Sequence, residues 1–239
     1  MVYSTEAIVL GYINYSETSV IVKCLTKKYG VKSYIIRGIR SNKKSKIQLG
    51  HLQRLNIVDI ESKENKKGDL SYLKNIKSLI SFQSINSDIL KYNTALFISE
   101  VLISVINHQE TDIKIFNFIK NSLAWFDNSE KNSDFHILFL LYLTNYLGII
   151  PEKNINNLKF FDIENGKFSS TLNSNNCVGG EIVEYLSLIL GTNFDYSSRV
   201  LTNVKQRRNM IDLILKYYKI HVPGFKLPKS VDILNDLFS

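Results

Sequence analysis

The chain has 239 residues, of which 44% are hydrophobic and 22% charged, a composition that suits one large or two small globular domains with buried cores. It contains neither a run of 18 apolar residues nor the basic start and apolar middle of a signal peptide, so we expect a cytoplasmic protein. Cys24 and Cys177 form no CxxC pair, which excludes a four-cysteine zinc site, and we expect neither a metal nor a cofactor.

The net charge of +8 is unevenly distributed along the chain. Residues 1–80 contain 15 Lys and Arg against six Asp and Glu, whereas residues 81–239 contain 15 against 16. A general abundance of lysine would not explain why the excess stops near residue 80. A positive field gathered in one third of a protein favours polyanions, and nucleic acids above all.

The first 80 residues predict short β-strands. Apolar and polar residues alternate in three segments separated by turn residues, and β-rich composition returns in two later segments. The five predicted strands are residues 5–14, 19–27, 31–37, 51–61 and 70–78. Five short strands with a basic loop are typical of the oligonucleotide-binding (OB) barrel, so we expect a five-stranded OB-type β-barrel over residues 1–80.

From residue 87 onward apolar residues recur at spacings of three and four, which predicts helices. The predicted helices are residues 89–105, 113–126, 135–147, 180–190, 197–222 and 231–238. The third is so apolar that it should be buried, and Gly148 and Pro151 mark its end. A polar stretch at about residues 151–178 is expected to be an irregular connector with a small hairpin. The predicted fold class is α+β, with an all-α helical domain over residues 81–239.

A basic loop follows the third predicted strand. It carries four cations within seven residues, and Arg37 closes the strand in front of it. The loop cations are Arg40, Lys43, Lys44 and Lys46. For each of them taken singly, the alternative is a solvated surface charge, which is the commoner role of a lone lysine. As a group they predict an edge of the barrel that binds nucleic acid, because neighbouring like charges repel unless a polyanion offsets them.

Two further kinds of residue could complete this interface. Lys32 shares a strand with Arg37, but the separation of five places the two on opposite sides of a regular strand. Tyrosines alternate with the cations, and a base stacked on an aromatic ring gains about 1–3 kcal/mol. We select Tyr34 or Tyr12 for this role; the alternative for each is packing in or around the barrel core.

The sequence offers little for an enzyme. It has no GxxxxGK[ST] loop for a nucleotide, and its four histidines lack HExxH or HxH spacing. His136 lies in the apolar helix and is read as a core residue, and the pair Gly179-Gly180 is too common to indicate a phosphate site. The barrel half has no cluster of carboxylates for catalytic metals. We therefore expect a protein without catalytic activity.

The order of these motifs resembles the RecO recombination-mediator family. The segments that carry the resemblance are Thr5–Leu10, Tyr15–Val22, Thr26–Gly30, Ile36–Arg40, Leu52-Gln53, Thr94–Leu102, Leu143–Pro151, Phe161–Phe168 and Tyr217–Phe238. They are collinear and cover essentially the whole chain. Two features depart from the family pattern. No cysteine lies between Pro151 and Asn176, which resembles the zinc-free subgroup, and Arg54 stands where a proline is usual.

The resemblance implies an N-terminal OB barrel, a helical C-terminal domain, and binding of single- and double-stranded DNA without catalysis. It also implies annealing of complementary strands, association with RecR, and indirect help in loading RecA at gaps. Arg37 occupies the DNA-binding position of the family. A further implied partner is the acidic C-terminal tail of single-stranded DNA-binding protein, which ends in apolar residues.

A receptor for that tail should combine cations with apolar side chains. The last long predicted helix carries apolar Val204, Ile211 and Leu215, surrounded by five cations. The cations selected for the tail are Lys205, Arg207, Arg208, Lys216 and Lys219. The alternative is an amphipathic helix with an ordinary charged face.

Two other functions are compatible with the same residues. An OB barrel can serve an RNA-binding protein, because RNA offers the same phosphates and stackable bases. The chain could also be a helical scaffold whose barrel binds another protein. Binding to matched DNA and RNA strands separates the first alternative, and the absence of nucleic-acid affinity at low salt would favour the second.

Overall fold

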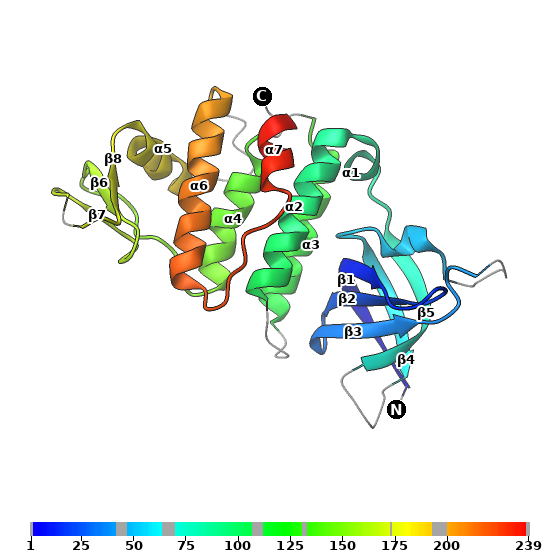
Figure 1. The fold of residues 1–239 in the computed structure, drawn as a ribbon. Coiled ribbons are helices and arrows are strands. Elements are labelled where there is room, and N and C mark those ends of the chain that lie inside the picture. Colours follow the sequence, from blue (N-terminus) through cyan, green and yellow to red (C-terminus); the bar gives the residue numbers. More distant parts are fainter. Residues whose placement is uncertain are drawn as a thin grey trace. The chain divides into compact units, whose positions relative to one another are not determined.

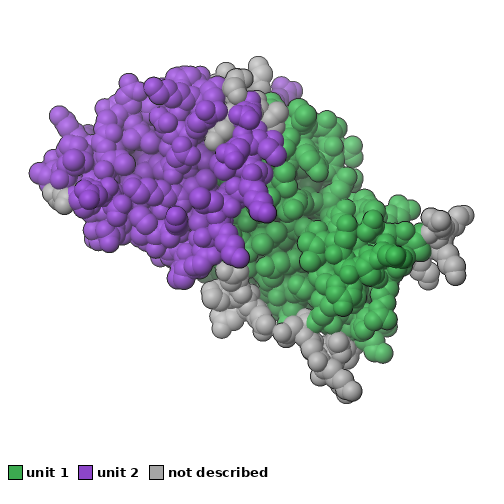
Figure 2. All heavy atoms as spheres, viewed as in Figure 1, with its two compact units in different colours: residues 1–129 green, residues 130–239 purple. Residues whose placement is uncertain are grey.

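The computed structural model describes residues 2–41, 47–63, 70–106, 112–130, 133–172, 174–192 and 200–237. It divides into two units, residues 1–129 and residues 130–239 (Figure 2). The first unit contains the predicted barrel and the three helices that follow it. The domain boundary that we expected at residues 80/81 remains a prediction about evolutionary and folding units, since in space these helices group with the barrel.

The barrel of the first unit has the predicted topology (Figure 1). Its strands are β1 (Val2–Asn14), β2 (Val20–Thr26), β3 (Gly30–Ile36), β4 (Ile57–Lys63) and β5 (Leu70–Ile80). They close in the order β1-β2-β3-β5-β4, with β1 paired to both β2 and β4. The β3–β5 pair is parallel and the others are antiparallel, which is the arrangement expected of an OB fold.

The fourth strand begins six residues later than predicted. A short 3-10 helix, η1 (Leu49–Leu52), occupies the start of the expected segment, and Leu55 has a positive φ of 63°. Leu52 and Leu55 are both buried, as their apolar character suggested, although neither belongs to β4. The backbone nitrogen of Leu55 already donates to the Val9 carbonyl oxygen of β1 at 2.6 Å, and regular pairing starts at Ile57.

Alternate residues of the strands fill the barrel interior. Side chains of one face, such as Val22, Cys24 and Tyr34, belong to a single buried cluster, as the period of two requires. Ile39 and Ile47, from the two described ends of the basic loop, lie in the same cluster. The loop is therefore anchored to the barrel core at both ends.

Helices cover the outer face of β1. Ile8 and Leu10 have no exposed surface, although they alternate with core residues, because α2 (Ile89–Val105) packs against this strand and α3 (Ile113–Asn128) lies beside it (Figure 1). Arg54, at the position where the resembled family has proline, contributes to this packing. Its Nη1 donates hydrogen bonds to the Leu10 carbonyl oxygen at 3.1 Å and to Ser99 Oγ of α2 at 2.8 Å.

An ion triad connects α3 to the barrel. Glu6 of β1 accepts from Lys27 Nζ at 2.8 Å and from Lys120 Nζ of α3 at 2.7 Å. These hydrogen bonds, the one from Lys120 first, hold the pKa of Glu6 below its usual value. One carboxylate thus serves two cations that come from different elements.

The ends of the first helices are capped by buried polar contacts. Asp127, near the end of α3, accepts from the backbone nitrogens of Gln83 and Ile85 at the start of α1 (Ser84–Ser87). Lys91 of α2 donates to the carbonyl oxygens of Phe126 and Ser129, at 2.9 and 2.6 Å. A cation at a helix C-terminus satisfies carbonyls that have no partner within the helix.

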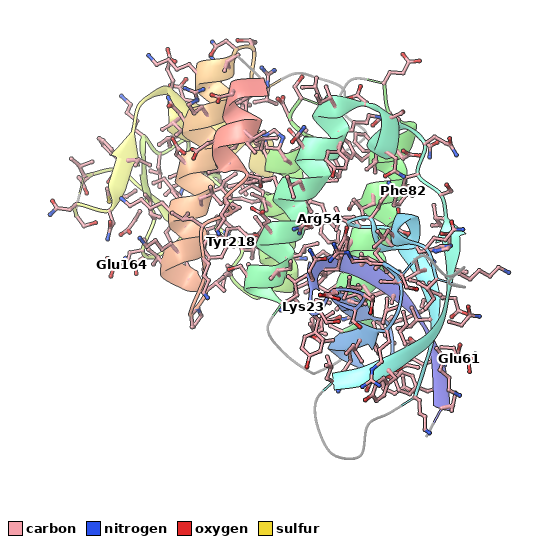
Figure 3. All side chains as sticks on the ribbon, turned by 45° about the vertical axis from the view of Figure 1, so that its right-hand side comes forward. Lys23, Arg54, Glu61, Phe82, Glu164 and Tyr218 are labelled. Carbon is pink, nitrogen blue, oxygen red and sulfur yellow. The ribbon has the colours of Figure 1, made fainter. Side chains whose placement is uncertain are left out.

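The second unit is built around α4 (Phe135–Tyr146), which is buried along most of its length, as predicted. It packs against α6 (Val204–His221), and Tyr218 Oη donates to the Leu140 carbonyl oxygen at 2.7 Å. Figure 3 labels Tyr218 on this helix. The predicted helix over residues 197–222 begins only at Val204, where Asn203 and Gln206 form a capping box. The remaining helices are α5 (Glu181–Leu190) and α7 (Val231–Leu237).

The connector of the second unit is more regular than predicted. Its strands β6 (Phe160–Asp162), β7 (Lys167–Ser169) and β8 (Cys177–Gly179) form a sheet in the order β7-β6-β8. The expected hairpin is present as β6–β7. β8 adds a third strand, which the sequence pattern did not predict. Phe161 is buried, and His221 Nε2 lies 2.8 Å from the Ile163 carbonyl oxygen, so the sheet is attached to α6.

Among the described residues, the helices are all too short or too polar to cross a lipid bilayer. The longest of them, α6, carries charges along one face.

Gly11→Ala should lower the free energy of unfolding by about 1–3 kcal/mol. Gly11 has a φ of 151°, and a Cβ atom there would lie 2.9 Å from Arg54 Nη1. Urea unfolding followed by circular dichroism measures the loss. In the background of Arg54→Ala the clash with the arginine side chain is absent, so Gly11→Ala should lower the free energy of unfolding by less. An equal cost in both backgrounds would show that Arg54 does not press on this site.

Glu6→Gln should remove a contribution of about 1 kcal/mol that depends on pH. Because the folded-state pKa of Glu6 lies below 4.5, its ion pairs stabilise the protein at neutral pH and are lost as the pH falls below that value. Unfolding measured between pH 7 and pH 3.5 should therefore show wild type and variant converging in acid. A constant difference over this range would contradict the assignment.

Candidate nucleic-acid interface

The register of the barrel strands places four side chains in one row across its outer wall. Ile13 pairs with Ile21, Ile21 with Ile35, and Ile35 with Tyr72, so the row crosses β1, β2, β3 and β5. The row points away from the interior, because the residues that alternate with it belong to the buried core. At the usual strand spacing it is about 14 Å long. We call these four residues the apolar row.

The two ends of the apolar row are open to solvent. Ile13 is 66% exposed and Tyr72 is 38% exposed, whereas Ile21 is half-buried and Ile35 is buried. An exposed apolar side chain at one end and an aromatic ring at the other provide surface on which bases can stack.

Arg37 is held against the aromatic end of the row. Its Nη2 donates to Tyr72 Oη at 3.0 Å, and its guanidinium carbon lies 4.9 Å from the centroid of the Tyr72 ring. A guanidinium above a tyrosine ring gains a cation–π attraction and is fixed in orientation. The strand position two residues after Ile35 thus carries an exposed cation that is already ordered.

Lys23 lies on the other side of the row. It pairs with Gly11 and Ser33 in the sheet and is half-buried on the outer wall (Figure 3). Burial lowers the pKa of Lys23, and among the described residues it makes no ion pair with a carboxylate. An ammonium group in this situation gains from a bound anion, which restores the interaction energy that burial removed.

The strands of this wall contain no acidic residue. β2, β3 and β5 together carry four lysines and neither Asp nor Glu. An acidic side chain of the neighbouring β4 does reach one of these lysines: the carboxylate of Glu61 is 3.9 Å from Lys74 Nζ of β5 (Figure 3 labels Glu61). The side chains of β2, β3 and β5 therefore contribute positive charge and no negative charge to this wall.

Arg40 stands at the start of the basic loop, in a turn of fixed geometry. The turn spans residues 38–41, where Ser41 donates to the Gly38 carbonyl oxygen and Ile39 is buried in the barrel core. The backbone nitrogen of Arg40 donates to the Thr18 carbonyl oxygen at 3.2 Å, which joins this turn to the β1–β2 turn. Exposed Tyr15 lies in that second turn. The two turns that carry exposed Arg40 and exposed Tyr15 are thus joined through their backbones.

The structure distributes the predicted cations unequally. Arg37 and Arg40 are exposed at the predicted edge, and the residues between them are anchored. Lys32 pairs with Cys24, a core residue, so it lies on the inner side of β3 and faces away from Arg37, as its spacing indicated. The other loop cations, Lys43, Lys44 and Lys46, lie outside the described residues.

The selection of Tyr34 as a stacking residue disagrees with the structure. Its ring is completely buried in the barrel core, and its hydroxyl oxygen lies 3.2 Å from that of Tyr3. Burial raises the pKa of Tyr34, so it stays neutral. Tyr12, the other selected residue, is exposed. Tyr72 was missed because only the parallel pairing of β3 with β5 brings it beside Arg37, and a pairing between distant strands leaves no local signal.

The predicted tail receptor on α6 is also corrected. Arg207 is buried and forms an ion pair with Asp134, Nε to Oδ1 at 2.7 Å, and its Nη2 donates to the Leu201 carbonyl oxygen. Ile211 and Leu215 are buried in the core of the second unit, so they present no apolar groove. The helix period, which placed cations around apolar residues, separates them onto opposite faces in the folded helix.

No metal centre is found among the described residues: they contain no group of three or more His, Cys, Asp or Glu side chains that could hold an ion. His136 is completely buried in α4. Burial, followed by the charge of Arg207, lowers the pKa of His136 to about 3, so its ring is neutral at physiological pH. This agrees with the core role that the sequence indicated.

Comparisons with known proteins agree with the architecture. A family model described as recombination protein O N terminal matches residues 1–82, and one described as recombination protein O C terminal matches residues 86–230. Proteins named DNA repair protein RecO are similar over their full length. Those of Christiangramia forsetii, Flavobacterium johnsoniae and Flavobacterium psychrophilum are 32%, 34% and 35% identical, and the alignments cover 100% of both chains.

Tyr72→Ala should weaken binding of a single-stranded oligonucleotide by about 5- to 100-fold, the range expected for loss of one stacked base. Tyr72→Phe keeps the ring and should retain most of the affinity. Fluorescence anisotropy with a labelled oligothymidine measures both. Tyr34→Phe is the matched control inside the barrel, and it should bind like wild type. A loss that is equal in Tyr72→Ala and Tyr72→Phe would assign the effect to the hydroxyl and its contact with Arg37 and not to stacking.

Proposed function

Because the chain belongs to the recombination protein O family of DNA repair proteins, we propose that it is a non-catalytic mediator that binds single- and double-stranded DNA and anneals complementary strands. The observation that supports this best is the acid-free outer wall of β2, β3 and β5. On that wall an ordered Arg37–Tyr72 pair and Lys23 flank the apolar row.

The two kinds of side chain on this wall suit different parts of a single strand. Bases stack on Tyr72 and on the exposed end of the row, while phosphates are neutralised by Lys23 and Arg37 on either side. Arg40 extends the cationic edge toward the β1–β2 turn. A wall of this size engages a few nucleotides at a time without reading their sequence, since every base has a face that stacks.

Annealing on this surface needs no catalytic group. Two complementary strands repel each other through their phosphates, and a protein that neutralises phosphates on both lowers the barrier to their encounter. The contacts are electrostatic and exchange easily, so base pairing replaces protein contacts as the duplex forms. The barrel supplies binding, and the base pairs supply the free energy of the reaction.

We also propose, from the family resemblance, that the protein acts in the cytoplasm, binds the acidic tail of single-stranded DNA-binding protein, associates with RecR, and thereby assists RecA at gaps. A protein that displaces or remodels a coat on single-stranded DNA must touch both the coat and the strand. The outer wall of β2, β3 and β5 would bind the single strand. The tail requires a separate receptor with apolar surface, which the exposed face of α6 does not offer.

Annealing should fall at least about tenfold when Arg37 and Arg40 are both replaced by alanine. The substrate is a pair of complementary oligonucleotides coated with single-stranded DNA-binding protein, and a fluorescent donor and acceptor report duplex formation. A matched control removes two exposed cations from elsewhere, Lys114→Ala with Lys153→Ala, and should anneal like wild type.

The same assay should show a steep decrease in annealing between 50 and 200 mM salt, because each phosphate contact releases counterions. An annealing rate that does not change with salt concentration would contradict the electrostatic mechanism. Matched RNA strands used as competitors separate the alternatives: an equal preference for RNA would point to an RNA-binding protein, and no binding of either at low salt would point to a scaffold.

A further inference from the structure

The exposed face of α6 carries a narrow line of cations. Lys205, Arg208, Lys216 and Lys219 are all exposed, and their spacings of three, eight and three residues place them within one side of the helix. We call these four residues the α6 stripe. At 1.5 Å per residue it extends about 21 Å along the helix, which equals the rise of about six base pairs.

The stripe has few acidic residues beside it on the helix. Asp212 is the one carboxylate among the exposed residues between its ends. Partial burial raises the pKa of Asp212, and the nearby charge of Arg208 acts in the opposite direction. Within the described part of the chain, Lys205, Lys216 and Lys219 form no ion pair with a carboxylate. Four cations against one acid on one helix face make a line of positive potential.

Apolar and aromatic surface is nearly absent from the same face. The apolar residues of α6 point into the unit, where Ile211, Ile214 and Tyr218 are buried, and Ile220 is its one large apolar side chain that is exposed. An unstacked base or a peptide with an apolar end would find almost nothing to contact here. A regular phosphate backbone needs only the cations.

We propose that the α6 stripe is a second nucleic-acid surface, which binds the phosphate backbone of duplex DNA independently of sequence. This inference rests on the proposed DNA-binding function and adds that two different surfaces bind the two forms of DNA. The barrel wall combines rings with cations and suits single strands, whereas the stripe has cations alone and suits the double helix, where phosphates are densest. The stripe would hold the product of annealing.

The test compares two variants that each lose four positive charges. The stripe variant is K205A/R208A/K216A/K219A. The scattered control replaces exposed lysines that form no line, K114A/K153A/K159A/K229A. All eight side chains are exposed, and circular dichroism and thermal melting verify that both variants fold. Anisotropy with a 30-base-pair duplex and with oligothymidine, each at several salt concentrations, measures binding by the full-length protein.

The stripe variant should bind the duplex at least about tenfold more weakly than the control, with a salt slope reduced by up to about 3.6, since each lost contact contributes about 0.9. Its affinity for oligothymidine should change less than about twofold. Asp212→Asn, which removes the one acid of the stripe, should strengthen duplex binding by at least about twofold without affecting oligothymidine. This gain cannot arise from misfolding.

Three results would overturn the proposal. Equal duplex binding by stripe variant and control would show that the stripe does not contact DNA, while binding by wild type would leave the proposed function intact. Loss of affinity for an acidic peptide with an apolar end, and not for duplex, would assign the stripe to a protein partner. Failure of wild type to bind either nucleic acid would refute both the stripe and the proposed function.

Discussion

Closure of the barrel is the constraint on which the rest of this structure depends. β3 and β5 are far apart in sequence and pair in parallel, and their pairing completes the circuit that β1 and β4 begin. Once the circuit is closed, every strand residue must point either into a small filled interior or out to the wall. Tyr34 fills the interior because of this, and Ile35, its neighbour, joins the outer row.

The same pairing creates the ordered part of the surface that we propose binds DNA. Parallel register brings Tyr72 beside Ile35. Arg37 follows directly after the end of β3, and its guanidinium lies on the tyrosine ring. A flexible surface arginine loses side-chain entropy when it binds a phosphate. An arginine that is already held by a ring and a hydroxyl has lost part of that freedom beforehand, which makes it a better binding residue than a solitary lysine of equal charge.

Charge alone does not distinguish binding residues from structural ones. Arg54 and Arg207 carry the same group as Arg37 but have structural roles. Arg54 fastens the segment between η1 and β4 to β1 and α2, and Arg207 is buried in an ion pair with Asp134. Glu6 likewise gathers Lys27 and Lys120 into a contact between strand and helix. The exposed cations considered for DNA form two sets, one beside aromatic surface on the barrel and one without such surface on α6. On this difference rests the proposal that the first set binds single strands and the second binds duplex DNA.

The sequence by itself determined the class of fold, the number of barrel strands, most helix positions and the basic edge at Arg37 and Arg40, because period, turn residues and charge are local properties. Its errors share one cause. The late start of β4, the third strand β8, the burial of Tyr34 and the pairing of Arg207 all depend on contacts between segments far apart in the chain. Only the tertiary structure decided these features. Tyrosine and arginine side chains are suited both to interior contacts and to exposed sites, and the segments that pack against them determine which of the two they adopt.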